Sequence, residues 1–166
     1  MQKDQEAKHG NGIQRIIGKL LIIFTKSTLI PGKYRARIQK LRGVQFDDVS
    51  TVFFGENVMI DGLYPQNVSF GRRCIITSGT KILTHFLDTE KLSDNPDFYF
   101  RFYQGKVRIE EDVFIGYNVV IAKPVTIGKG SIVGANAVIT HDVEPYSVMA
   151  GIPAKCIRTL NPTEIK

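Results

Sequence analysis

The stretch IEEDVFIGYNVVIAKPVTIGKGSIVGANAVIT, residues 109–140, places an aliphatic side chain at every sixth position. An α-helix repeats about every 3.6 residues and a simple strand about every two, so neither element produces this period. A fixed period that runs through consecutive units is typical of repeat proteins, and it predicts a solenoid. The repeated anchors are Ile109, Ile115, Ile121, Ile127, Val133 and Ile139.

Each unit of the repeat is expected to form a short strand followed by a turn. The anchor side chain points inward and stacks on its equivalent in the next coil, with about 4.8 Å between neighbouring strands. A glycine follows several anchors, as at Gly116, Gly128 and Gly134, where the chain bends and adjacent coils approach each other. Because every coil covers the face of its neighbour, we predict one continuous core.

Two interruptions divide the upstream part of the repeat. The first is a step of ten positions after Ile60, and the second separates Ile82 from Ile109. The second contains residues 86–106, which are rich in Asp, Tyr, Phe and Pro, and we expect a loop ejected from the solenoid. Long loops in a regular scaffold are usually functional. The upstream anchors are Phe54, Ile60, Phe70, Ile76 and Ile82.

Positive charge is concentrated at the N-terminal end of the chain. Residues 1–43 contain ten Lys or Arg and two Asp or Glu, a net charge of +8, whereas residues 44–166 have a net charge of −2. The overall charge of +6 therefore does not belong to the repeat, and we expect no nucleic-acid partner.

The basic segment is expected to contain two short helices, residues 13–24 and 33–42, on either side of a Pro31-Gly32 turn. We favour a cap on the exposed N-terminal edge of the solenoid, because repeat proteins need one. The alternative is a basic amphipathic surface, residues 13–42, that contacts an anionic membrane, and the two roles are compatible. The apolar stripe of the first helix is Ile13, Ile16, Ile17, Leu20, Leu21 and Phe24.

Length and composition fit one globular domain of 166 residues, with 43% hydrophobic and 23% charged residues. We divide it into a helical cap at 1–43, a solenoid at 44–158 and a tail at 159–166. No apolar run reaches the roughly 18 residues of a membrane span, and we expect no signal peptide. The two cysteines, Cys74 and Cys156, indicate neither a disulfide framework nor a zinc site, so we expect a cytoplasmic protein.

Three runs give the chain a family resemblance: VFIGYNVVIAKPVTIG (113–128), IVGANAVIT (132–140) and AGIPAKCIR (150–158). With a histidine in mid-repeat, the chain resembles the hexapeptide-repeat acyltransferases over about residues 54–158. The subgroup most similar to it contains the galactoside, maltose and xenobiotic O-acetyltransferases and those of surface polysaccharide synthesis. The resemblance implies an all-β fold, a left-handed parallel β-helix with three hexapeptides per coil. It also implies a homotrimer with active sites between subunits.

His85 lies where the solenoid is interrupted and the ejected loop begins. The resemblance implies that it is the general base, which takes the proton from an acceptor hydroxyl that attacks an acetyl thioester. Imidazole suits this task because its pKa lies near working pH. A carboxylate or carbonyl should orient the ring, and Asp88 and Glu90 are the nearby candidates.

The resemblance also implies acetyl-CoA as the acyl donor, without a metal. Tyr117 and Ala135 would face the pantetheine arm. Thr140 and His141 occupy a place usually held by Thr-Lys. Lys155 and Arg158 would meet the nucleotide phosphates, a task for which cations are suited.

The expected function is acetyl-CoA-dependent O-acetylation of a sugar hydroxyl, in the biosynthesis of a surface polysaccharide such as capsule or O-antigen. Serine or an amino sugar is an alternative acceptor. A γ-type carbonic anhydrase has the same fold but needs three His ligands, and beyond His9 in the N-terminal tail only His85 and His141 exist here. A non-catalytic scaffold is the third class, and it predicts that loss of His85 changes no activity.

Overall fold

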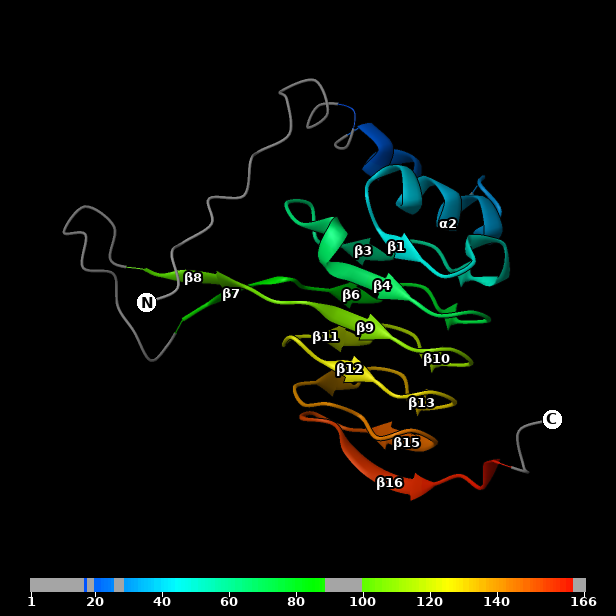
Figure 1. Ribbon diagram of the computed structural model, residues 1–166, viewed down its shortest axis with the longest axis vertical. Helices are drawn as coiled ribbons and strands as arrows, with labels where there is room; N and C mark the ends of the chain where they lie inside the picture. Colours follow the sequence, from blue (N-terminus) through cyan, green and yellow to red (C-terminus); the bar gives the residue numbers. More distant parts are fainter. Residues whose placement is uncertain (1–16, 18–19, 26–28, 89–99, 163–166) are drawn as a thin grey trace.

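The computed structural model describes residues 17, 20–25, 29–88 and 100–162 (Figure 1). Most of the strands belong to three parallel sheets, here called A, B and C. Sheet A contains β1 Gln45–Phe46, β4 Val68–Phe70, β9 Val107–Ile109 and β12 Thr126–Ile127. The parallel part of sheet B contains β2 Phe53–Phe54, β5 Ile75–Ile76, β10 Phe114–Ile115, β13 Ile132–Val133 and β15 Ser147–Ala150. Sheet C contains β3 Met59–Ile60, β6 Lys81–Ile82, β11 Val120–Ile121 and β14 Val138–Ile139.

The chain visits sheets A, B and C in turn, so it winds into a three-sided parallel coil (Figure 1). Ile115 lies in register with Val133, three six-residue units later along the chain, and Ile121 lies in register with Ile139. The period of six therefore gives one side of the coil per unit. A solenoid is confirmed, and it is mostly β with few helices.

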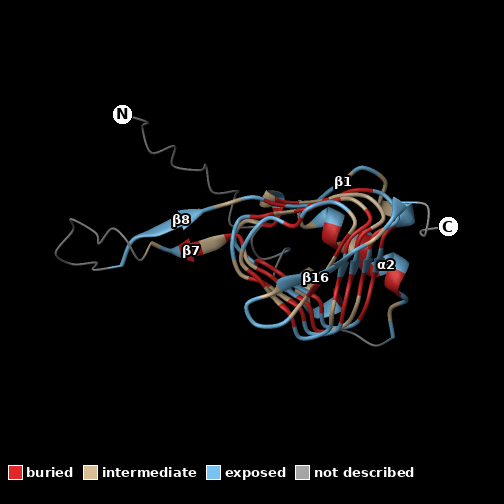
Figure 2. Ribbon diagram, turned by 90° about the horizontal axis from the view of Figure 1, so that it is seen from below, coloured by how far each residue is buried: buried red, intermediate tan, exposed pale blue. Residues whose placement is uncertain are grey.

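The predicted anchors form the inside of the coil, as the view along the stack in Figure 2 shows. The residue four positions after an anchor is also buried, for example Val113, Val119 and Ala137. These side chains belong to one continuous hydrophobic cluster, as the repeat predicted. The buried anchors include Phe54, Ile60, Phe70, Ile76, Ile82, Ile109, Ile115, Ile121, Ile127, Val133 and Ile139.

The three corners of the coil differ in their backbone. Left-handed residues occur where sheet A passes to sheet B and where B passes to C, and asparagine and aspartate are among the residue types that tolerate this conformation. Among the described residues, none between a strand of sheet C and the next strand of sheet A has a positive φ, although Gly43, just before β1, has one and lies beside Pro65 and Gln66 of this corner. That corner is the one where the chain leaves the repeat. The left-handed positions are Arg73, Asp112, Gly130 and Tyr146 at A–B, and Asn57, Gly79, Asn118, Asn136 and Gly151 at B–C.

Both interruptions of the repeat fall at the C–A corner. The first is taken up by a 3₁₀ helix, η2 Pro65–Asn67, and a further 3₁₀ helix, η1 Val49–Thr51, lies at the first A–B corner. The second was expected to be a loop, yet its two ends pair as antiparallel strands, β7 His85–Leu87 and β8 Phe102–Gln104. Phe and Tyr favour extended backbone, and this explains the difference. The β7–β8 hairpin projects from the coil in both views (Figures 1 and 2).

The ends of the coil carry different elements. A helix is confirmed at α2 Gly32–Leu41, which packs on β2 and η1 (Figure 1). Residues 20–25 are also helical, whereas two members of the expected apolar stripe, Ile13 and Ile16, lie outside the described residues. At the other end, β16 Lys155–Thr159 turns back antiparallel to β15. Within the described part of the chain, no helix is both long and apolar enough to cross a bilayer.

The outer faces of sheets A and B differ in polarity. On sheet B, four exposed apolar residues are aligned by the strand register, and we call them the sheet B stripe: Phe53, Ile75, Phe114 and Ile132. The same position of the strands in sheet A carries polar residues: Gln45, Ser69, Arg108 and Thr126.

Candidate active site

His85 is paired with a buried carboxylate at the C–A corner. Its Nδ1 lies 2.6 Å from Oδ2 of Asp61. The Asp61 side chain is 1% exposed, whereas that of His85 is 39% exposed. Because a carboxylate accepts hydrogen bonds, Nδ1 carries the proton and Nε2 remains the basic nitrogen. His85 can therefore act as a base whose ring is oriented by Asp61 and is partly exposed to solvent.

Asp61 is held by hydrogen bonds on both oxygens. The Thr84 backbone N–H (3.0 Å) and hydroxyl (2.7 Å) donate to Oδ2, and the Leu63 N–H donates to Oδ1 at 2.8 Å. Burial raises the pKa of Asp61, but the hydrogen bonds from Thr84, Leu63 and His85 outweigh it and hold that pKa below its ordinary value. Asp61 is therefore ionised at neutral pH and can stabilise a protonated His85.

The coil register explains why Asp61 reaches His85. Ile60 in β3 lies in register with Ile82 in β6, so the residues after each strand meet at the same corner. The sequence pointed to Asp88 or Glu90 as the orienting carboxylate, because both are near His85 in the chain. For His85 Nδ1 the structure corrects this expectation to Asp61. Asp88 lies beyond the His85 position in the hairpin, where its N–H donates to the Arg101 carbonyl, and Glu90 lies outside the described residues.

An aromatic ring contacts His85, whereas the aromatic pair of the β7–β8 hairpin lies on the other face of that hairpin. The ring of half-buried Tyr64 meets the imidazole edge to face, with centroids 6.3 Å apart. In the β7–β8 hairpin, Tyr103 packs on Phe86 at 5.4 Å, and Phe102 is exposed. The Tyr64 ring beside this base suits an acceptor with an apolar face, such as a sugar ring.

The residues predicted for the acyl donor fall on three parts of the coil. Tyr117 and Ala135 occupy the B–C corner one coil apart, where the Asn136 N–H donates to the Tyr117 carbonyl at 2.8 Å. Thr140 and His141 lie at the C–A corner, with 2.8 Å between Thr140 Oγ1 and His141 Nδ1. Sheet C lies between these two corners, and the C–A corner also carries His85.

The last two predicted donor residues lie on β16. Lys155 and Arg158 are exposed there and pair in register with Ala150 and Val148 of β15. The turn between these strands reaches the B–C corner, because the Ala154 N–H donates to the Val138 carbonyl at 2.8 Å. One chain thus brings together Tyr117 and Ala135, but it does not gather all six residues into one pocket.

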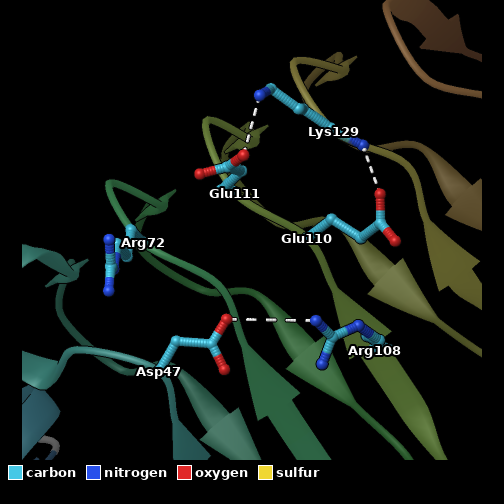
Figure 3. Close-up of a pocket in the computed structure, with 6 residues that line it drawn as sticks. All are labelled: Asp47, Arg72, Arg108, Glu110, Glu111 and Lys129. Atoms are coloured by element: carbon cyan, nitrogen blue, oxygen red, sulfur yellow. Dashed lines mark hydrogen bonds and ion pairs between the residues drawn. The ribbon is translucent and has the colours of Figure 1, made fainter.

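A depression of about 360 Å³ lies elsewhere, at the A–B corner (Figure 3). Its charged side chains neutralise one another: Lys129 Nζ lies 2.7 Å from Glu111 Oε1, and Arg108 lies 3.9 Å from Asp47. His85 lies at the opposite edge of sheet A, and none of the predicted site residues line this depression. We therefore read it as an ion-pair network of the surface. Its lining is Asp47, Arg72, Arg108, Glu110, Glu111 and Lys129.

The cysteines and metal ligands of the described residues offer no second centre. Cys74 is buried, and burial raises the pKa of its thiol to about 11, so it is a poor nucleophile at neutral pH. Groups of three or more His, Cys, Asp or Glu that could hold a metal are absent from the described part of the chain.

Comparison with known protein sequences identifies the repeat. The family described as "Bacterial transferase hexapeptide (six repeats)" matches residues 106–141. The "Putative acetyltransferase C18B11.09c" of Schizosaccharomyces pombe is 32% identical over 125 residues, which cover 69% of this chain and 56% of that protein. The chain therefore spans little more than half the length of this relative.

Two solved structures share the fold. The maltose O-acetyltransferase from Clostridium difficile 630 has a TM-score of 0.63 at 21% identity, over 90% of this chain and 87% of that chain. A hexapeptide-repeat acetyltransferase from Vibrio cholerae O1 biovar eltor, solved with acetyl coenzyme A, has a TM-score of 0.61 at 21% identity, over 90% and 88%. This likeness implies that the coil winds left-handed. The predicted resemblance to the hexapeptide-repeat acetyltransferases is confirmed.

Proposed function

Because the chain carries the hexapeptide repeat of bacterial transferases and has the fold of hexapeptide-repeat acetyltransferases, we propose that it is an acetyl-CoA-dependent O-acetyltransferase. The acceptor is a hydroxyl group of a sugar. The observation that carries the proposal is the His85–Asp61 pair, a half-exposed imidazole backed by a buried carboxylate. A neutral hydroxyl is a weak nucleophile without such a base.

His85 moves one proton in each direction during the proposed reaction. Acetyl-CoA supplies the acetyl group as a thioester. Nε2 of His85 takes the hydroxyl proton as the acceptor oxygen bonds to the acetyl carbon, and it returns that proton to the thiolate that leaves. Asp61 keeps the ring in the required tautomer and balances the charge of the imidazolium.

We place the acyl donor along sheet C. Tyr117 and Ala135 border this sheet at the B–C corner, and Thr140 and His141 border it at the C–A corner. The pantetheine arm would contact Tyr117 and Ala135. The phosphates would meet the cations that the sequence singled out, Lys155 and Arg158.

Assembly into a homotrimer would complete the site. The sheet B stripe is an exposed apolar surface whose members are aligned across four strands, and a second copy of the chain is the occupant that suits it. The predicted donor residues are spread over several parts of one chain, which favours a site shared between neighbouring subunits.

A surface polysaccharide precursor is the acceptor class that we favour. The maltose O-acetyltransferase relative acts on a sugar, and the net charge of +8 on residues 1–43 suits an enzyme that meets lipid-linked acceptors at an anionic membrane. We propose a cytoplasmic protein with residues 13–42 at the inner membrane face. The division into a cap at 1–43, a solenoid at 44–158 with the loop at 86–106, and a tail at 159–166 stays a prediction.

The proposal is tested by release of free CoA from acetyl-CoA against a panel of sugars, nucleotide sugars and oligosaccharides, with serine and amino sugars included. His85→Ala should lower kcat by about a hundredfold or more, because the base is lost. His141→Ala, at the same corner, should raise KM for acetyl-CoA and leave kcat within about threefold. Full turnover in folded His85→Ala contradicts the assignment of His85 as the general base. If the native chain releases no CoA with any acceptor, the non-catalytic scaffold is favoured.

A further inference from the structure

Two arginines, Arg35 in α2 and Arg42 at its C-cap, bind the open edge of the first coil. In this coil stack the backbone carbonyls of the anchors accept hydrogen bonds from the preceding coil, as Ile115 accepts from the Thr77 N–H. The anchors of the first coil, Phe54 and Ile60, have no preceding coil, and their carbonyls accept from arginine side chains instead. Nη1 of Arg35 donates to the Phe54 carbonyl at 3.1 Å, and Nη2 of Arg42 donates to the carbonyls of Ile60 (3.1 Å) and Asp61 (3.2 Å).

The two arginines perform the same chemistry at different places. Phe54 lies in sheet B and is remote from His85. Asp61 lies at the C–A corner, and its side chain is the carboxylate that holds His85. The guanidinium of Arg42 is fixed in turn, because its Nη1 donates to Oε1 of the buried Gln39 at 2.6 Å.

We infer that Arg42 is a positioning residue, which fixes the backbone of Ile60 and Asp61 and thereby holds the Asp61 carboxylate against His85. An aspartate has one methylene between backbone and carboxylate, so the position of its peptide decides where its oxygens lie. The charge of Arg42 also lies near the Asp61 carboxylate. Burial lowers the pKa of Arg42 and the Asp61 charge opposes that effect.

Through Arg42, the end of α2 is thereby connected to the proposed chemistry. The expected effect on the rate of acetyl transfer rests on the proposed function. A planar guanidinium can donate to two carbonyls and a side-chain amide at once, whereas an ammonium is a compact point charge without that fork. A displacement of about 1 Å at a catalytic group can cost up to a hundredfold in rate.

The test compares Arg42→Gln and Arg42→Lys with Arg35→Gln, the matched variant that also uncaps an edge carbonyl. Arg42→Gln should lower kcat for acetyl transfer by about tenfold to a hundredfold, with KM for acetyl-CoA unchanged. Arg42→Lys should recover part of that loss. Arg35→Gln should lower the melting temperature by a similar amount and keep kcat within about twofold. If kcat follows the melting temperature equally in all three variants, the inference is overturned.

A second measurement does not depend on activity. The Thr84 N–H donates to Asp61 Oδ2, so amide hydrogen exchange at Thr84 reports whether the carboxylate stays in place. We expect Thr84 to lose protection in Arg42→Gln and to keep it in Arg35→Gln. If the native chain transfers no acetyl group, the proposed function fails, but the exchange measurement still tests whether Arg42 positions Asp61. Unchanged protection of Thr84 in Arg42→Gln, or equal loss in both variants, overturns the inference.

Discussion

At the scale of single residues, Asp61 combines burial with charge. Its pKa is held below the ordinary value by the hydrogen bonds that outweigh burial, so the ionised form stabilises the folded protein. That contribution is present above about pH 4, the ordinary range of an unfolded aspartate, and it is lost as the pH falls through the lowered pKa of the folded state.

Asp61→Asn should therefore destabilise the fold near neutral pH and much less in acid. We expect a loss of about 1–3 kcal/mol in the free energy of unfolding at pH 7, because the amide cannot accept the same charge-assisted hydrogen bonds. Urea unfolding from pH 7 down to pH 3 measures the difference from the native chain, which should shrink below about pH 4. Exposed Glu144→Gln is the control. A difference that is constant with pH contradicts the account.

The sequence predicts His85 by its place at the end of the repeat, but it does not predict Asp61 as its partner. Sequence proximity favoured Asp88, whereas the contact depends on which residues share a corner of the coil. The signal was present, since Ile60 and Ile82 are equivalent anchors and Asp61 directly follows the first. It could be used only after the ten-residue step at the first interruption was known to lie at the C–A corner.

At the scale of elements, the close contact between coils restricts which side chain can follow an anchor. A Cβ added to Gly116 would lie 2.7 Å from the backbone nitrogen of Ala135 and from the Val133 carbonyl oxygen. Backbone atoms on both sides belong to the next coil and cannot rotate away. The requirement at this glycine is therefore space.

Gly116→Ala should lower the free energy of unfolding by about 1–3 kcal/mol, because the coils must separate to admit the methyl group. Gly62→Ala is the matched control. There the nearest atom is Ile22 Cδ1 at 3.9 Å, and the change should stay within about 0.5 kcal/mol. Chemical denaturation of both variants measures the two losses, and equal losses count against steric contact as the cause.

The repeat predicts the strands of the three parallel sheets other than β1 and β15, because each of these strands contains an anchor whose burial is dictated by its neighbours. It does not predict β7, β8 or β16. The first two pair only with each other, and β16 reverses direction on β15, so none of them follows the period of six. Residues outside a repeat are placed by local contacts that the period does not encode.

At the scale of the whole molecule, we expect the sheet B stripe to direct the proposed assembly of subunits. Its four members are exposed in one chain and aligned across four strands, and a partner subunit would remove them from water. A charge placed within such an interface would be desolvated without a partner, which opposes association.

Phe114→Lys should therefore shift the protein from trimer to monomer, as measured by light scattering coupled to size-exclusion chromatography. Thr126→Lys, on the outer face of sheet A, should leave the trimer intact. Acetyl transfer by Phe114→Lys should fall with the trimer, since the proposed site is shared between subunits. A native chain that is monomeric at micromolar concentration contradicts this prediction.

The reversal of β16 affects how further chains could stack on the end of the coil. Parallel strands leave both ends of a solenoid with unpaired backbone, so a further chain could in principle stack on the last coil and continue it, one molecule after another, into a filament. On sheet B the last strand runs the opposite way and presents an antiparallel edge, while α2 covers the first coil. On sheet B, parallel growth along the axis therefore meets a mismatched edge at one end, and the first coil meets a helix at the other.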